Sequence, residues 1–319
     1  MKGKTKVLFI TVRSDMGGGP KHVYELCSGL SEIDVYIASP CDAPYYEKYR
    51  SISNGHIKIP HRKFSLLKLI ELIQYCRNNG INIVHSHGRG AGIYSRFMGL
   101  FGFKVVHTFH GVHHASIVER MLKHLTNRFI CVSRSEMINA LAFGLCEKIN
   151  TVVIPNGIEE KKYSDITSPG KKILGTISRL DPHKNNGELI RFMKELPEYH
   201  LLIAGDGEEK EYLKSIAPTN VEFMGYVDDI PNFLNKIDIY VSASRGEGLP
   251  YSVLEAMAAG KKIVLSDVVG HNDIEGNILL YKPEQLEIFK NALLKAENCK
   301  ISTEYCINNQ IKKIEQIYE

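Results

Sequence analysis

Residues 244–260 read SRGEGLPYSVLEAMAAG and are the most informative stretch of the chain. They follow the apolar run DIYVSAS at 238–244, which predicts a buried strand. Gly248 and Pro250 predict a turn after that strand, and the apolar residues beyond them recur at helical spacing. The stretch contains two acids, Glu247 in the turn and Glu255 on the predicted helix.

Glu247 falls at the carboxyl end of the predicted strand, in the loop that leads into a helix. In an open parallel sheet this is the crevice where ligands bind, and the amides of the helix end favour anions. Because a phosphate would repel a carboxylate, we expect Glu247 to bind a hydroxyl-rich part of the ligand. A structural alternative stays open, in which Glu255 is a solvated helix residue and Glu247 complements the helix dipole.

The segment EGLPYSVLEAMAAG resembles the E-x7-E signature of retaining glycosyltransferases of the GT-B fold, in the large family four. The resemblance implies that Glu247 hydrogen-bonds the hydroxyls of a donor sugar and senses charge on its ring. It implies that Glu255 binds the ribose hydroxyls of a nucleotide, and that Gly248 and Leu249 belong to the same donor site.

The bulk composition is that of a soluble protein with room for two domains: 319 residues, 44% apolar and 24% charged. The net charge of +4 is the sum of +9 over residues 1–165 and −5 over 166–319. A basic first half indicates an acidic partner, such as an anionic lipid surface or a phosphorylated acceptor. Nucleic acid fits the charge as well, but we do not expect it as a partner.

The seven cysteines include no C-x-x-C pair, which argues against a disulfide framework and a structural zinc site. The apolar run at 7–12 is too short for a signal peptide, and no run reaches membrane-spanning length. We therefore expect a cytoplasmic protein, with peripheral attachment to the inner face of the cell membrane as the further expectation.

A glycine-rich loop follows the first predicted strand at 7–12 and precedes a helix predicted over 21–30. Its glycines, Gly17, Gly18 and Gly19, would let backbone amides approach an anion at the helix end. They match neither G-x-G-x-x-G nor a Walker loop, so a loop with unusual backbone angles is the structural alternative. Family-four enzymes carry a similar loop near the donor phosphates and the acceptor.

Residues 64–79 predict an amphipathic helix, with an apolar set that we expect to pack by one face. That set is Leu66, Leu67, Ile70, Ile73 and Tyr75. Basic residues, Lys63 and Lys68 among them, surround it. Solvated lysines on a packed helix are the simpler interpretation, and a patch that binds a membrane interface is the alternative.

Histidines cluster after two further predicted strands, at 82–87 and 104–110, and four of them fall within eight residues. These four are His107, His110, His113 and His114. They end a strand instead of sharing a helix face, and no acid is near in sequence, so we expect no metal site. The segment VVHTFHG resembles the family segment that ends in His-Gly, which implies that His110 orients the donor sugar and leaves His107 to the core.

Residues 155–157, PNG, form a turn by their chemistry and match the family's P-N-G-[VI]-D, with Glu159 in place of the Asp. Residues 159–170 are polar and rich in helix breakers, and we interpret them as a linker between domains. A second alternation of strands and helices then begins at 171.

The segment SRLDPHKN at 178–185 holds Arg179 and Lys184 in a loop between a strand and a helix. An Arg and a Lys at that spacing can both reach a diphosphate, although an exposed basic loop would look the same. The segment resembles the family's G-R-L-x-x-x-K-[NG], with Ser178 replacing Gly. The resemblance assigns Arg179 and Lys184 to the donor diphosphate.

Three further segments of the second half of the chain have counterparts in the family. The run HLLIAGDGE, which contains Gly205, matches a family turn at the donor site, and Tyr226 and Val227 fall where relatives line the nucleobase pocket with backbone. The loop from Gly270 is shorter than in relatives and lacks their Pro-Glu pair, which puts this wall of the donor site in doubt. Residues 303–318 predict a final helix of the kind that crosses back to the first domain.

These observations predict an α/β chain of two Rossmann-like parallel-sheet domains facing a cleft, with domains at 1–165 and 166–300 and a last helix in 301–319. The predicted activity is retaining, metal-independent transfer of a sugar from a nucleotide-diphosphate donor, UDP before GDP, with no other cofactor. The predicted acceptor is a saccharide or a lipid-linked saccharide of surface polysaccharide or glycolipid. The alternatives are a non-catalytic subunit that binds sugar nucleotides and an epimerase of the same fold.

Overall fold

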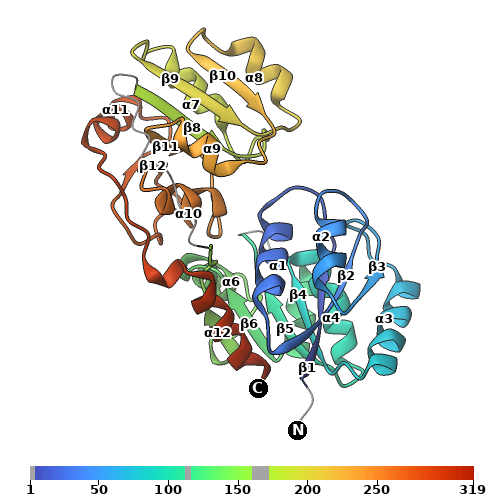
Figure 1. Cartoon of the computed structure of the whole chain (residues 1–319). Helices are drawn as coiled ribbons and strands as arrows, with labels where there is room; N and C mark the ends of the chain where they lie inside the picture. The colour runs from blue at the N-terminus through green and yellow to red at the C-terminus, as the bar shows by residue number, and fades with distance from the viewer. Residues whose placement is uncertain (1–3, 112–115, 160–171) are drawn as a thin grey trace. The chain divides into compact units, whose positions relative to one another are not determined.

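The computed structural model describes residues 4–111, 116–159 and 172–319. The chain forms two compact units, one comprising Met1–Gly157 with Cys306–Glu319 and the other Ile158–Tyr305 (Figure 1). The domain boundary predicted between 165 and 166, like most of the predicted linker, lies outside the described residues. Each unit is an α/β layer structure around one parallel sheet.

The sheet of the first unit is entirely parallel, in the order β3-β2-β1-β4-β5-β6-β7. Its strands are β1 (Thr5–Thr11), β2 (Ile33–Ser39), β3 (Gly55–Lys58), β4 (Ile83–His87), β5 (Lys104–Thr108), β6 (Arg128–Cys131) and β7 (Thr151–Val153). Its helices are α1 (Gly18–Gly29), α2 (Tyr45–Ile52), α3 (Leu66–Asn79), α4 (Arg89–Gly99), α5 (Ile117–Leu122), α6 (Arg134–Ala142) and α12 (Ile307–Tyr318). Short 3-10 turns are η1 (Lys123–Leu125) and η2 (Lys148–Asn150).

Apolar residues fill both faces of this sheet, which is why its strands are near-continuous apolar runs. In β1, Val7 and Phe9 pack with α1 and α12, whereas Leu8 and Ile10 pack with α3 and α4 on the opposite face. All four side chains are fully buried. The strand order reverses between β1 and β4, so the loops after these two strands meet at the topological switch point of the sheet.

The last helix, α12, belongs to the first unit and packs beside α1. The Tyr318 hydroxyl lies 2.6 Å from His85 Nδ1 in β4, and the Gly157 amide donates to Gln310 Oε1 at 3.0 Å. A Cβ on Gly157 would lie 2.6 Å from Ile307 Cα, so the glycine of the PNG turn permits this close backbone approach.

The second unit has a six-stranded parallel sheet in the order β10-β9-β8-β11-β12-β13. Its strands are β8 (Lys172–Ile177), β9 (Tyr199–Ala204), β10 (Val221–Gly225), β11 (Ile239–Ser242), β12 (Lys262–Ser266) and β13 (Ile278–Tyr281). Its helices are α7 (Asn186–Met193), α8 (Lys210–Ile216), α9 (Ile230–Asn235), α10 (Tyr251–Ala258) and α11 (Leu286–Lys295), with a 3-10 turn η3 (Thr303–Tyr305). Here the order reverses between β8 and β11, and the two strands are neighbours.

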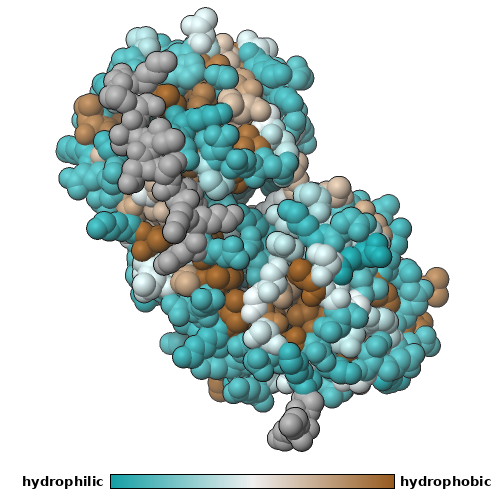
Figure 2. Space-filling view, in the orientation of Figure 1, coloured by the Kyte–Doolittle hydropathy of each residue, from teal (hydrophilic) through white to brown (hydrophobic). Residues whose placement is uncertain are grey.

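The packing of α3 differs from the prediction made for it. The buried face consists of Leu69, Leu72, Ile73 and Cys76. Leu66 and Leu67, which were expected to pack, are 64% and 74% exposed, and Ile70 is 45% exposed. The helix carries apolar residues on more than one face, and contact with the sheet decides which face is buried. The face of the molecule seen in Figure 2 is mainly hydrophilic, with apolar residues in smaller areas.

Candidate functional site

The loops after β8 and β11 meet at the switch point of the second unit and bring two predicted site residues into contact. Lys184 Nζ donates to Glu247 Oε1 at 2.5 Å. The two side chains are only 19% and 12% exposed, so the ion pair is largely removed from water. A cation predicted for a diphosphate and a carboxylate predicted for a sugar therefore lie side by side.

Further hydrogen bonds hold these two loops together independently of that ion pair. The Arg245 amide donates to the His183 carbonyl oxygen at 2.9 Å, and His183 Nε2 lies 2.5 Å from the Gly246 carbonyl oxygen. Because that carbonyl only accepts, Nε2 carries the proton. Asn185, in a left-handed conformation at φ 54°, donates from Nδ2 to the Ala243 carbonyl oxygen at 3.2 Å. The site thus rests on two loops that are fixed to each other.

Arg179 does not contact Glu247; it pairs with Asp181, NH2 to Oδ2, at 2.9 Å. The other oxygen of Asp181 accepts the Lys184 amide at 3.0 Å. Asp181 therefore links the two basic residues of the loop, a role that was missing from our sequence prediction. The Asp-Pro pair at 181–182 is the signal that could have indicated it, since Asp readily accepts from a backbone amide further along a turn.

The charge state of Glu247 follows from its surroundings. Burial acts to raise the pKa of its carboxyl group, but the Lys184 ammonium and a hydrogen bond from Ser244 outweigh burial, and the pKa lies below its ordinary value. Glu247 is therefore an ionised acceptor of hydrogen bonds, and not a proton donor.

The remaining predicted residues of this stretch line the start of α10. Gly248 and Leu249 are buried, and Glu255, on the helix, is only 8% exposed. The structural alternative that made Glu255 a solvated helix residue is therefore wrong. The Tyr240 hydroxyl donates to Ser252 Oγ at 2.8 Å and ties α10 to β11.

Gly205, Tyr226 and Val227 lie after β9 and β10, on the other side of β8. Gly205 has φ +140°, and an added Cβ would collide with the Ser178 carbonyl oxygen, so this glycine lets the chain pass directly against the loop of Arg179. Tyr226 is 48% exposed and donates to Asp228 Oδ1 at 2.6 Å, and Val227 is half-buried.

The short loop from Gly270, where the chain departs from the family pattern, packs directly on Glu247. The Glu247 amide donates to the Val269 carbonyl oxygen at 2.9 Å, and a Cβ on Gly270, at φ +88°, would collide with the Glu247 carbonyl. His271 is buried behind it, where Nδ1 donates to the Ser266 carbonyl oxygen at 2.9 Å. Burial lowers the pKa of His271, although Glu247 acts in the opposite direction.

In the first unit, the predicted glycine loop forms the N-terminus of α1, with Gly17 as its cap and Gly18 and Gly19 as its first residues. Arg13 folds over this loop: its guanidinium pairs with Asp15 at 2.7 Å and donates to the Met16 carbonyl oxygen at 2.8 Å. Helix α1 starts at Gly18, three residues before the predicted start at residue 21, so two of the three glycines belong to the helix.

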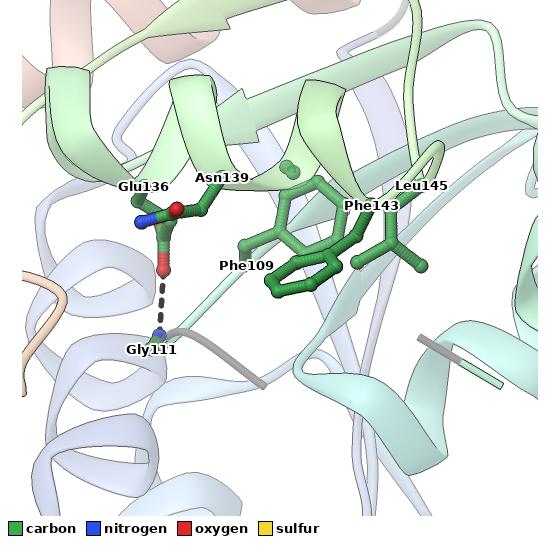
Figure 3. Close-up of a pocket in the computed structure, with 7 residues that line it drawn as sticks. Phe109, Gly111, Glu136, Asn139, Phe143 and Leu145 are labelled. Carbon is green, nitrogen blue, oxygen red and sulfur yellow. Dashed lines mark hydrogen bonds between the residues drawn. The ribbon is translucent and has the colours of Figure 1, made fainter. Parts of the chain in front are cut away.

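His110 follows β5 and is half-buried, and its backbone is held from α6. Glu136 Oε1 accepts the amide of the next residue, Gly111, at 2.6 Å, as Figure 3 shows, and Glu136 Oε2 accepts the Val132 amide at 2.7 Å. Burial raises the pKa of Glu136 to about 7, although both hydrogen bonds act to lower it. Glu136 was not among the predicted site residues, and its only signal in the sequence is its place three residues after the helix cap Ser133.

Figure 3 also shows that Glu136 and Asn139 stand at one end of a small pocket, and that Phe109, Phe143 and Leu145 line its other end. Glu136 is itself 2% exposed, so its carboxyl group is shielded from water. The pocket lies in the first unit, beneath α6.

Three histidines from distant parts of the sequence meet at the switch point of the first unit: His22 in α1, His87 at the end of β4, and His110. His87 Nδ1 and His110 Nε2 are 3.3 Å apart, and the rings of His22 and His110 are 4.5 Å apart. Burial lowers the pKa of His22 to about 4 and that of His87 well below its ordinary value.

Among the described residues, the other histidines of the predicted group add no ligand atom to this group of three, although the ring of His85 lies 4.2 Å from that of His87. His107 is a core residue, 1% exposed, and lies 2.9 Å from Ser86 Oγ. His113 and His114 lie outside the described residues. His85, in β4, uses both ring nitrogens, toward the hydroxyls of Tyr318 and Thr108.

Two sequence models of known families match the chain. One, described as "Glycosyl transferases group 1", matches residues 158–313, and the other, "Glycosyltransferase Family 4", matches residues 16–162. Together the two matches span residues 16–313 of the chain. The chain belongs to the GT-B glycosyltransferases of family four, and it is a transferase.

Relatives of similar sequence are named as glycosyltransferases, and solved structures share the fold. The UDP-Gal:alpha-D-GlcNAc-diphosphoundecaprenol alpha-1,3-galactosyltransferase of Escherichia coli is 28% identical over 81% of this chain and 81% of its own length. An N-acetylgalactosaminyltransferase of Campylobacter jejuni, named for a diphospho-undecaprenol acceptor, is 30% identical over 53% of this chain and 44% of its own. The crystal structure of Anabaena Alr3699/HepE with UDP and glucose superposes with a TM-score of 0.80, at 18% identity, over 98% of this chain and 99% of that one.

Proposed function

We propose that the chain is a retaining, metal-independent glycosyltransferase that moves a sugar from a UDP-sugar to a saccharide linked to a lipid diphosphate. The observation that carries the proposal is the contact between Lys184 and Glu247 at the β8/β11 switch point. The UDP found with a solved structure of the same fold and the undecaprenol acceptors in the names of two relatives support the choice of donor and acceptor.

In this proposal Lys184 and Arg179 bind the donor diphosphate. Each is paired with a carboxylate in the structure, Lys184 with Glu247 and Arg179 with Asp181. An arriving diphosphate competes for both cations, and these stabilise the charge that develops on the leaving group, the task that a metal ion performs elsewhere. Glu247, released from Lys184, then accepts hydrogen bonds from the hydroxyls of the donor sugar.

The other predicted residues take supporting roles in the same proposal. Glu255 would bind the ribose hydroxyls, and the backbone of Tyr226 and Val227 would line the base. In the first unit, His110 would contact the donor sugar, and the amides of the Gly17–Gly19 loop would lie near the phosphates. Glu136 would position His110 by holding the Gly111 amide at 2.6 Å.

A membrane surface fits the proposed acceptor, because a lipid diphosphate remains in the bilayer. Within the described part of the chain, every helix is too short or too polar to cross a membrane. We propose that the exposed apolar side chains at the start of α3 dock on anionic lipid. Phe64, Leu66 and Leu67 are 44%, 64% and 74% exposed there, and Lys63 stands beside them. Exposed apolar residues beside basic ones are the composition of an interfacial helix.

The experiment is release of nucleotide from a panel of UDP- and GDP-sugars, with and without GlcNAc-diphosphoundecaprenol and with EDTA present. Release from one UDP-sugar that rises with the lipid acceptor is expected, and NMR of the product should show the donor's anomeric configuration retained. Lys184→Ala and Glu247→Ala should each lower release by about 100- to 1,000-fold. Lys194→Ala and Glu195→Ala, exposed residues of the same unit, are the matched controls. Equal release in all four variants would overturn the assignment of the site.

A further inference from the structure

We propose that His22, His87 and His110 form a binding site for one divalent transition-metal ion of the zinc class, at the β1/β4 switch point of the first unit. One ligand atom from each imidazole can be chosen such that all three lie within 4.8 Å of one another. His87 Nδ1 and His110 Nε2 are already 3.3 Å apart. Two nitrogens that each lie about 2.05 Å from a tetrahedral zinc ion are separated by roughly 3.3 Å, so the spacing of this pair matches that of two ligands of one ion.

The third imidazole is held in the form that a metal requires. His22 Nδ1 lies 2.9 Å from Asn156 Oδ1, and because an amide oxygen only accepts, Nδ1 carries the proton. Nε2 of the neutral ring then offers its lone pair. A ligating histidine commonly donates its other N–H to an oxygen in this way, which fixes the tautomer and the orientation of the ring. Asn156 therefore acts as an outer partner of the site, and it is itself 3% exposed.

The burial of the three ligands gives the site a closed and an open side. His22 and His87 are 1% and 4% exposed, whereas His110 is half-buried. Three protein ligands leave a fourth position of a tetrahedral ion, and the open side lies toward His110. A water, a hydroxyl or an anion could take that position. The site is thus of the type with one exchangeable ligand.

The proposed ion would act against the proposed sugar transfer, and this consequence rests on the role proposed above for His110. An imidazole nitrogen that binds the ion is no longer available to a sugar hydroxyl. Binding of zinc should therefore inhibit, whereas EDTA should leave activity intact or raise it. The metal site itself is independent of that role and is tested without measuring activity.

The first test is binding of Zn²⁺ and Co²⁺ to the full chain, by calorimetry and by the visible d–d bands of tetrahedral Co²⁺. One equivalent per chain is expected. His110→Ala, whose half-buried side chain can be removed without opening the core, should lose the Co²⁺ bands, and His22→Ala should also lose them. Asn156→Ala should weaken binding by about 10- to 100-fold. His124→Ala, at a histidine whose side chain is 68% exposed, is the control and should bind as the wild type does.

X-ray absorption at the zinc edge of the wild-type protein tests the ligands without any substitution. Three imidazole nitrogens and one further light atom are expected. Sulfur in the first shell would assign the ion to the cysteines, and would overturn the proposal. Absence of stoichiometric binding, or Co²⁺ bands unchanged in His110→Ala and His22→Ala, would overturn it as well. Stoichiometric binding at these histidines without inhibition would establish the metal site and contradict only the role of His110 in transfer.

Discussion

Lys184 and Glu247 are 63 positions apart in the sequence and form a largely buried ion pair, with Nζ 2.5 Å from Oε1. Removing one member leaves the other charge buried and unpaired, which is more destabilising than removing both. We expect Lys184→Met and Glu247→Gln each to lower the free energy of unfolding by about 1 to 3 kcal/mol, and the double variant to lose less than their sum. A double-mutant cycle in urea checks this, and strict additivity would contradict it.

The pH dependence of the same pair has a definite sign. The folded-state pKa of Glu247 lies below its ordinary value, so the pair stabilises the fold above that value. The contribution should disappear as the pH falls through the folded pKa. In Lys184→Met this acid-sensitive part should be absent, because the lysine that holds the pKa down is gone. Urea unfolding measured from pH 7 to pH 3 on both proteins tests the prediction, and equal slopes would refute it.

The pH dependence of stability that arises from Glu136 should have the opposite sign. Burial raises its folded-state pKa to about 7 from the model-compound value of 4.5, so the folded protein holds the proton more tightly than the unfolded chain. The contribution of Glu136 to the free energy of unfolding is then greatest below pH 4.5. It falls as the pH rises toward 7 and above, by at most roughly 3 kcal/mol. Glu136→Gln should remove this part of the slope, and Glu32→Gln, at an exposed residue of the same unit, should keep it. A wild-type slope in Glu136→Gln would contradict the assignment.

Two glycines with the same backbone angle provide a matched pair. Gly270 and Gly102 both have φ +88°, but an added Cβ meets the Glu247 carbonyl at Gly270 and meets nothing within 4 Å at Gly102. Gly102→Ala should cost roughly 1 to 2 kcal/mol through backbone strain alone. Gly270→Ala should cost more, and should also lower nucleotide release by about 100-fold by displacing Glu247. Equal effects in thermal unfolding and in release would show that the contact at Gly270 does not matter.

The membrane proposal predicts an unequal contribution from two neighbouring lysines. Lys68 pairs with Glu71 at 2.6 Å, so its charge is partly cancelled, whereas no salt bridge of Lys63 occurs among the described residues. In sedimentation with vesicles that contain anionic lipid, Lys63→Glu should weaken binding more than Lys68→Glu.

Substitution of the apolar residues of the same patch gives a larger expected effect. Leu66→Glu with Leu67→Glu should abolish vesicle binding, because both side chains would have to enter the interface. Ile149→Glu, at an apolar residue that is 86% exposed elsewhere in the unit, is the control. Vesicle binding unchanged in the double leucine variant would refute the docking surface.

Much of the fold could be predicted because its signals are local. Each buried parallel strand is a short apolar run, and each helix after it has its own periodicity and turn residues, so the alternation was evident from residue 7 onward. The motifs around Glu247 and Arg179 are local in the same sense. Predictions failed where local signals were ambiguous: α3 has apolar residues on several faces, and only contact with the sheet shows that Leu69 is inside and Leu67 outside.

The sequence by itself determined the class of fold, the two parallel sheets and the residue types at the ends of their strands, because these depend on periodicity and on spacing along the chain. The tertiary structure alone decided which of those residues meet. Strand order reverses between β1 and β4 and between β8 and β11, and this reversal places Lys184 against Glu247 and His22 against His87 and His110. Contacts of this kind depend on which strands are neighbours, and strand neighbours are chosen by the packing of the whole sheet.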